Sequence, residues 1–247
     1  MKRADEHIRA LVKAMNEIGM TRGLETVFRD WCHCFALSIA NTSCPFHDKQ
    51  WESRERRYLE IIGKYSKDEV ARFPTMCADL SEAFEVDTFQ DHPGRVYMEL
   101  FGGQKRLGQC FTPMPVCHAC AVAAIEPVDG ETRTCADEAC GGGAMLIAAC
   151  QVYREHSVDY QRWLKITAGD IDSLCVHMCY IQLSLIGARA MVYHADALTR
   201  DTWDCFVTPM EYMWPMKYMS PESEQARKPE TPTPTTKPKR NGQLELF

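Results

Sequence analysis

Apolar residues recur at helical spacing through the first hundred residues of the chain. In the first segment these residues are Ile8, Leu11, Val12, Met15 and Ile18, which lie one, three or four positions apart. Larger side chains continue the pattern over residues 28–39, and residues 52–64 form a further amphipathic stretch. The pattern predicts a helical N-terminal region over residues 1–105.

The stretch over residues 52–64 carries three arginines beside its apolar positions, namely Arg54, Arg56 and Arg57. Charged residues on one side of an amphipathic helix usually form a solvated face, and a DNA-binding patch is the alternative. We expect a solvated face here.

From about residue 106 short runs of β type alternate with helical segments. Strands are predicted over residues 132–136, 164–168 and 190–193, with one helix after Gly143 and another over residues 173–186. Such alternation is typical of a parallel sheet with right-handed crossover connections. We therefore expect an α/β core over residues 106–219.

The composition changes again after Tyr218. Residues 220–242 hold five prolines among Thr, Lys and Glu and almost no apolar side chain. A segment with so little to bury cannot offset the entropy that is lost on ordering. The sequence therefore predicts a disordered C-terminal tail over residues 220–247.

Charge and apolar runs limit the protein's environment. With 28 basic and 34 acidic residues, the formal net charge is −6, so bulk electrostatics do not favour phosphate binding, and any DNA contact must be local or supplied by a partner. No apolar run approaches the roughly 18 residues that cross a bilayer, and residues 1–20 lack the apolar block of a signal peptide. We expect a cytoplasmic protein that does not bind membranes.

Cysteine usage agrees with that location. The 13 cysteines are an odd number and most lie in apolar runs, which indicates buried thiols in a reducing compartment rather than a disulfide framework. Cys32, His33, Cys34, Cys44 and His47 offer potential zinc ligands, and Cys117 and Cys120 offer another pair. The spacing differs from that of common zinc fingers, so we expect buried thiols and no metal.

The sharpest local motif is the glycine-rich segment at residues 137–147, which follows a predicted strand and opens an apolar helix. Glycines let a ligand approach the backbone, and a helix N-terminus offers unpaired N–H groups. An ordinary tight turn is the alternative.

Acidic residues at the ends of the next two strands favour a ligand site. The second strand ends at Asp170, where a carboxylate can accept hydrogen bonds from two ribose hydroxyls, whereas Asp172 fits a helix N-cap. The third strand ends at Asp196. Because the carboxyl ends of parallel strands share one edge of a sheet, these residues are expected to converge with the glycine-rich segment on one crevice.

These segments resemble the N6-adenine DNA methyltransferases of type I restriction-modification systems, whose modification subunits use S-adenosylmethionine. Residues 108–113 are similar to the family's Gly-Gln-Phe-Phe-Thr-Pro box, and residues 137–147 are similar to Asp-Pro-Ala-Cys-Gly-Ser-Gly-Gly-Phe-Leu-Ile. The departures are Cys110, Glu138, Gly142, Ala144 and Met145. The resemblance implies a truncated Rossmann-like methyltransferase core of α/β class, with DNA and a specificity subunit as partners.

The same resemblance implies S-adenosylmethionine as cofactor and a set of contacts to it. The box would lie against the methionine end, Asp170 would hold the ribose, Ile171 would pack on the adenine ring and Asp196 would meet the adenine amino group. The full set of implied cofactor residues is Gln109, Phe111, Thr112, Asp137, Ala139, Gly141, Gly143, Asp170, Ile171 and Asp196.

The family's catalytic Asn-Pro-Pro-Phe or Tyr box is missing. In that box an amide and a backbone carbonyl hold the target amino group while the aromatic ring stacks on the flipped base. The nearest segment is residues 203–211, where Thr208 and Pro209 would stand at the Asn-Pro positions and Tyr212 is the nearest following ring. Two functions stay open, a DNA adenine-N6 methyltransferase and a catalytically inactive methyltransferase-like binding module.

The last five residues form a separate motif. A disordered tail gains nothing from Leu244, Leu246 and Phe247 unless a partner buries them. Residues 243–247 resemble the bacterial sliding-clamp binding peptide, Gln-Leu-Ser/Asp-Leu-Phe, with Glu245 at the variable acidic position. The resemblance implies that Gln243, Leu244, Leu246 and Phe247 contact the clamp; a peptide that folds back on its own domain is the alternative.

Overall fold

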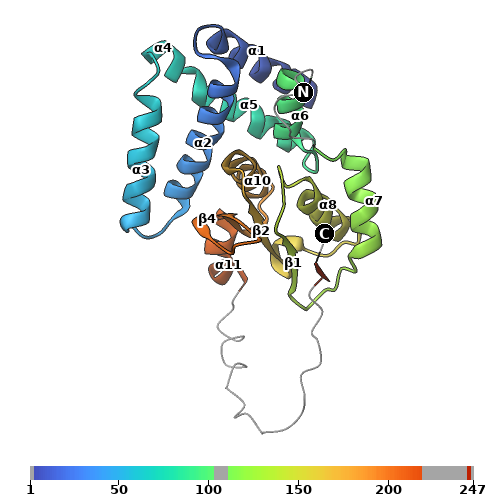
Figure 1. Cartoon of the computed structure of the whole chain (residues 1–247). Coiled ribbons are helices and arrows are strands. Elements are labelled where there is room, and N and C mark those ends of the chain that lie inside the picture. Colours follow the sequence, from blue (N-terminus) through green and yellow to red (C-terminus); the bar gives the residue numbers. More distant parts are fainter. Residues whose placement is uncertain (1–2, 103–110, 219–243, 246–247) are drawn as a thin grey trace.

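The computed structural model describes residues 3–102, 111–218 and 244–245. Helices form its N-terminal part (Figure 1). They are α1 (Ala4–Arg22), α2 (Leu24–Ser43), α3 (Lys49–Ile62), α4 (Lys67–Val70), α5 (Arg72–Val86) and α6 (His92–Phe101). The predicted stripe of α1 is confirmed, because Ile8, Leu11, Met15 and Ile18 are at most 2% exposed.

Short polar side chains mark where several of these helices begin. Asp48 accepts the backbone N–H groups of Gln50 and Trp51 at the start of α3. Ser66 and Glu69 form a reciprocal capping box on α4, and Asp91 accepts the N–H of Gly94 at the start of α6. Each cap satisfies backbone donors that the helix itself leaves free.

The rest of the described chain is an α/β unit built on a mostly parallel sheet. The strand order is β4-β3-β2-β1-β5. The parallel strands are β1 (Arg133–Asp137), β2 (Leu164–Asp170), β3 (Arg189–Ala195) and the short β5 (Leu244–Glu245), whereas β4 (Thr202–Val207) runs antiparallel to β3. The three strands predicted from the sequence are β1, β2 and β3, and the predicted α/β class with a helical N-terminal region is confirmed.

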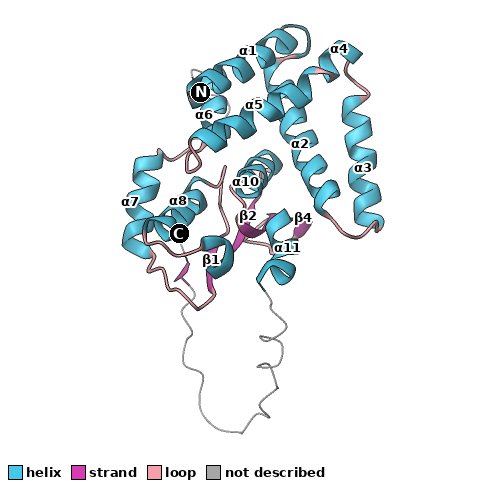
Figure 2. Ribbon diagram, turned by 180° about the vertical axis from the view of Figure 1, so that it is seen from behind, coloured by secondary structure: helices cyan, strands magenta, loops and turns pink. Residues whose placement is uncertain are grey.

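Within the described ranges, five helices accompany the sheet. They are α7 (Met114–Ala124), α8 (Ala144–Glu155), α9 (Tyr160–Trp163), α10 (Ser173–Leu185) and α11 (Pro209–Tyr218). Figure 2 shows α10 between the N-terminal helices and the strands. Residues 174–183 of α10 are all buried, because α2 packs on one side of the helix and β2 and β3 pack on the other.

One hydrophobic core joins the two parts of the chain. A single cluster of buried residues runs from Ile8 in α1 through Trp31 in α2 and Val176 in α10 to Phe206 in β4. The N-terminal helices are therefore packed against the sheet unit and are not a separately cored module. No helix in the described ranges is long and apolar enough to cross a membrane.

One prediction about α3 is wrong. Arg54 was expected on a solvated face, but it is only 4% exposed, and its Nη2 donates to the carbonyl oxygen of Cys205 at 2.5 Å. Its guanidinium also lies 5.1 Å from the centre of the Phe206 ring. Helical periodicity could not reveal this, because the partner strand is about 150 positions away in the sequence.

Candidate functional site

The loop between β1 and α8, residues 138–143, is shaped by its glycines and is called the glycine loop below. Gly143, at the N-cap of α8, has φ of 95°, in the left-handed region. A Cβ at Gly143 would stand 2.9 Å from Sγ and 3.3 Å from the backbone Cα of Cys179 on α10. Only glycine fits both the backbone conformation and this close approach. The predicted glycine-rich turn is thus built against α10.

Asp170 fastens this loop to the end of β2. Its Oδ2 accepts the backbone N–H of Gly141 at 2.9 Å, and its Oδ1 accepts that of Asp172 at 2.8 Å. In addition, the N–H of Cys140 donates to the carbonyl oxygen of Gly169 at 2.9 Å. The ends of β1 and β2 therefore meet as the sequence predicts, and Asp172 caps α10 by accepting the N–H of Leu174.

A second carboxylate lies at the same edge. Asp137 ends β1, is 6% exposed, and accepts the N–H of Ala139 at 3.1 Å. Burial raises the pKa of Asp137, the hydrogen bond from Ala139 opposes this, and the negative charge of Asp170 adds to the rise. A ligand that donates hydrogen bonds or carries positive charge would relieve the repulsion between the two carboxylates.

The surroundings of Asp170 suit a nucleoside. Each oxygen of this carboxylate accepts one backbone N–H, and a carboxylate has about four lone-pair positions, so acceptor capacity remains for hydroxyl groups. The adjacent Ile171 is 63% exposed although it is a large apolar residue. An acceptor beside an uncovered apolar side chain matches a ribose hydroxyl pair beside a planar base.

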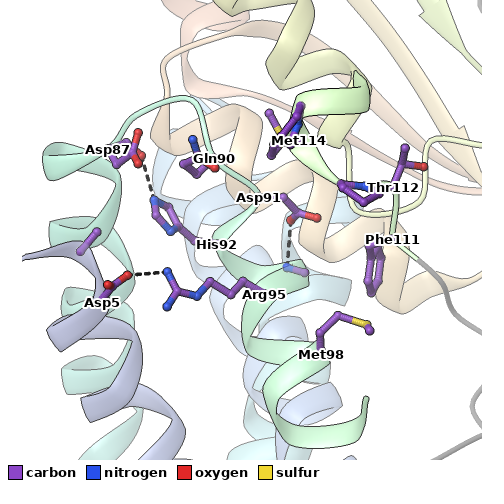
Figure 3. A pocket seen from close by; sticks show the side chains of 14 residues that line it. Asp5, Asp87, Gln90, Asp91, His92, Arg95, Met98, Phe111, Thr112 and Met114 are labelled. Atoms are coloured by element: carbon purple, nitrogen blue, oxygen red, sulfur yellow. Dashed lines mark hydrogen bonds and ion pairs between the residues drawn. The ribbon is translucent and has the colours of Figure 1, made fainter. Parts of the chain in front are cut away.

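Phe111 closes the other side of the glycine loop. Its ring stands edge-on to Tyr97 of α6 at 5.2 Å, and a Cβ at Gly142 would meet its Cε1 at 3.3 Å. Phe111 and Thr112 also line a pocket of about 430 Å³ with Asp91, Arg95 and other residues of the N-terminal helices (Figure 3). Gln109, the third predicted cofactor residue of the segment at residues 108–113, lies outside the described residues.

Asp196 follows β3 at this edge of the sheet, and its side chain caps the turn that it begins. Its Oδ1 accepts the N–H groups of Leu198 at 2.8 Å and Thr199 at 3.2 Å. The contacts that the structure records for Asp196 are thus those of a turn cap, which is a common role of aspartate.

A model of the N-6 DNA methylase family matches residues 93–237, more than half of the chain. The chain belongs to the N-6 DNA methylase family. The matched residues include the segment at residues 108–113 that contains Phe111, the glycine loop, Asp170 and Asp196. Family membership assigns S-adenosylmethionine as the cofactor, and the carboxylates, the glycine loop and the exposed Ile171 fit its nucleoside part.

Two further comparisons gave little. A comparison with curated proteins gave no match. Among solved structures, the chain is similar to a Listeria monocytogenes protein described as a class I S-adenosylmethionine-dependent methyltransferase, with 12% identity and a TM-score of 0.41. The similarity covers 76% of this chain and 53% of the Listeria protein, so the methylase-family chain spans about half of that protein's length.

In this methylase-family chain Thr208 and Pro209 do not lie with the predicted cofactor residues. Because β4 is antiparallel to β3, its last residue, Val207, pairs with Met191 near the start of β3. Thr208 is 0% exposed, and its Oγ1 donates to the carbonyl oxygen of Ala188 and accepts the N–H of Ala190.

This position corrects the catalytic interpretation of the two residues. Thr208 and Pro209 stand at the edge of the sheet opposite to Asp137 and Asp170, and Tyr212 follows on α11 at that same edge. Thr208 connects β3 to the start of α11, which is a structural role.

The C-terminal peptide is described at two positions only. Leu244 and Glu245 form β5, beside Cys135 and Ala136 of β1 in a parallel register. The other predicted clamp contacts, Gln243, Leu246 and Phe247, lie outside the described residues, as does the predicted tail over 220–242. The two described residues occupy an edge of β1 that a strand can join.

Most of the residues considered as zinc ligands lie on α2 and in the loop after it, and the Cys117 and Cys120 pair lies on α7. Cys32 and Cys34 are buried, and burial raises the pKa of Cys34 to about 12, so this thiol stays protonated at neutral pH. His33 stacks on His177 at 4.3 Å, and the exposed His47 stacks on Trp51 at 4.4 Å. Every cysteine within the described ranges is a free thiol, and the prediction of buried thiols holds for Cys32, Cys34 and Cys117, while Cys120 is exposed.

Two residues that help to hold the loop were not predicted from the sequence. Gln182 of α10 donates to the carbonyl oxygen of Gly142 and to Asp91, which caps α6. Neither residue belongs to a recognisable motif. The sequence signal for Gln182 was that its side chain is the only amide in the otherwise apolar segment at residues 178–183. A polar group that is buried in such a segment needs a hydrogen-bond partner.

Proposed function

We propose that this N-6 DNA methylase-family protein binds S-adenosylmethionine at the carboxyl edge of β1, β2 and β3 and acts in DNA adenine methylation of the restriction-modification type in the cytoplasm. The observation that carries the proposal is the glycine loop, whose Gly141 N–H is held by Asp170 beside the exposed Ile171. When bound, the cofactor supplies the methyl group. The chain's own residues bind and orient its nucleoside part.

Calorimetry of the full chain with S-adenosylmethionine tests the binding step. We expect one site, with micromolar affinity typical of an enzyme cofactor. A chain that is folded by circular dichroism and yet shows no heat of binding would refute the proposal.

Catalytic competence is a separate question, with the inactive binding module as the second candidate. The sequence contains no Asn-Pro-Pro segment, and Thr208 and Pro209 stand at the other edge of the sheet. These observations favour a chain that holds the cofactor and depends on a partner, such as a specificity subunit, to hold the target base. Labelled methyl incorporation into adenine-containing DNA by the purified single chain would support the enzyme, whereas cofactor binding without incorporation would support the module.

We also propose that residues 243–247 bind the bacterial sliding clamp. The 23 residues of the 220–242 segment would span about 25 Å as a flexible coil. A tether of this length would let an acidic protein work beside DNA that passes through the clamp. The pairing of Leu244 and Glu245 with β1 implies that the clamp must compete with the sheet edge for this peptide.

Changing Leu246 and Phe247 together to alanine should abolish co-elution with the clamp, because these side chains supply the apolar anchors. The pairing of β5 uses backbone groups of other residues, so this variant should bind S-adenosylmethionine as the wild type does. Glu245→Ala, at the variable position, is the matched control and should keep clamp binding. A drop in melting temperature of several degrees in the double variant, with clamp binding retained, would show that the peptide instead packs on its own domain.

A further inference from the structure

Gln182 is a fully buried polar residue on a helix that is otherwise apolar around it. It is 0% exposed, and its Nε2 donates to the carbonyl oxygen of Gly142 at 2.6 Å and to Oδ1 of Asp91 at 2.9 Å. Both partners are acceptors, so only one orientation of the amide satisfies them. The side chain therefore connects the glycine loop with the start of α6.

The contact at Gly142 fixes a peptide plane inside the cofactor loop. The carbonyl of the peptide between Gly142 and Gly143 is held by Gln182, and its N–H donates to the carbonyl oxygen of Cys140 at 2.8 Å. Because a peptide unit is planar, hydrogen bonds to both its carbonyl and its N–H fix the orientation of the whole peptide plane. The neighbouring N–H of Gly141 is held by Asp170. The loop is thus fastened from β2 on one side and from α10 on the other.

The amide is retained at an energetic disadvantage. Within the described residues, Oε1 of Gln182 is buried without a hydrogen-bond partner. An unpaired buried acceptor destabilises a fold, and an apolar residue of similar size would avoid it. What an apolar residue cannot do is hold Gly142 and Asp91 together.

Asp91 brings the N-terminal helices into this arrangement. Its Oδ1 also accepts the N–H of Gly94, and burial raises the pKa of Asp91. Asp91 lines the same pocket as Phe111 and Thr112 (Figure 3). Any shift of α6 against α10 would therefore move Gln182 and, through it, the loop.

We propose that Gln182 is a positioning residue of the glycine loop and that Asp91, the N-cap residue of α6, sets the affinity for S-adenosylmethionine through it. This inference rests on the proposed function, because it concerns the same cofactor site. It adds that the helical N-terminal region, most of which lies before the matched residues 93–237, helps to shape the site. A preformed loop binds more tightly, because less conformational entropy is lost on binding.

Calorimetry with S-adenosylmethionine on full-length variants tests the inference. Gln182→Met leaves the buried carbonyl of Gly142 unpaired and should weaken binding about 10-fold or more. Asp91→Ala should also weaken cofactor binding, although Asp91 lies in the N-terminal helical region and not in the sheet unit. Asp91→Asn keeps an acceptor oxygen for Gln182 and should retain affinity within about threefold of the wild type.

Tyr180→Phe is the matched control for the loss of a buried hydrogen bond on α10. Its hydroxyl donates to the carbonyl oxygen of Val207, away from the loop. We expect a loss of melting temperature comparable to that of Gln182→Met, with unchanged cofactor affinity. The inference would be overturned if the wild type binds the cofactor and Gln182→Met binds it with the same affinity. It would also be overturned if Tyr180→Phe lost as much affinity as Gln182→Met. Absence of binding by the folded wild type would instead refute the proposed function.

Discussion

Replacement of Asp170 by alanine should reduce binding of S-adenosylmethionine by more than 100-fold. The carboxylate accepts the N–H groups of Gly141 and Asp172, and under the proposed function it also holds the ribose. Each hydrogen bond to a charged group contributes about 1.5–3 kcal/mol, so losing the loop tether and the ribose contact together exceeds the roughly 2.7 kcal/mol of a 100-fold change. Calorimetry on the folded variant measures the effect.

Asp48→Ala provides the matched control for this variant. Asp48 also accepts two backbone N–H groups, those of Gln50 and Trp51, but it does so at the start of α3, in the N-terminal region. Its loss should lower stability by about 1 kcal/mol and leave cofactor affinity unchanged. If Asp170→Ala binds the cofactor as tightly as Asp48→Ala does, neither the loop tether nor a ribose contact of Asp170 contributes to affinity, and the assignment of the ribose contact fails.

The parallel part of the sheet could be predicted because each strand is a short β-branched or apolar run with a helix between it and the next. The predicted runs 132–136, 164–168 and 190–193 correspond to β1, β2 and β3 with small shifts at their ends. The glycine loop and Asp170 followed from the same logic, because parallel strands bring their carboxyl ends to one edge.

Neither β4 nor its direction was predicted, although the spacing contained a signal for the direction. Only residues 196–201 separate β3 from β4, whereas a parallel crossover needs about a dozen residues or more. A short connection requires an antiparallel neighbour, and that places Thr208 at the edge away from Asp137. The family resemblance suggested a catalytic position for Thr208, but the length of the connection decides its location.

Contacts between distant segments could not be predicted from local patterns. The amide of Gln182 was visible as a polar residue in an apolar helix, but nothing in the sequence indicated Asp91 as its partner. Arg54 likewise shares α3 with Arg57, and both contact β4, yet only Arg54 of the two is buried. Helical periodicity identifies the apolar side of α3, and the arrival of β4 determines which arginine is buried.

Arg54→Met should therefore destabilise the protein by about 3 kcal/mol, since removing one partner of a buried charged contact leaves the desolvated groups opposite it with weaker compensation. The variant removes the shorter of two hydrogen bonds to the carbonyl oxygen of Cys205, which keeps only Nε2 of Gln50 at 3.4 Å, and it removes a cation that stands 3.8 Å from Asp204. Arg57→Met is the control, because Arg57 lies on the same helix and contacts the same Asp204 at 3.4 Å but has a side chain that is 44% exposed. An exposed pair contributes about 0–1 kcal/mol. Urea denaturation of both variants measures the difference, and equal free energies of unfolding would contradict the view that α3 is held to β4 through the buried guanidinium of Arg54.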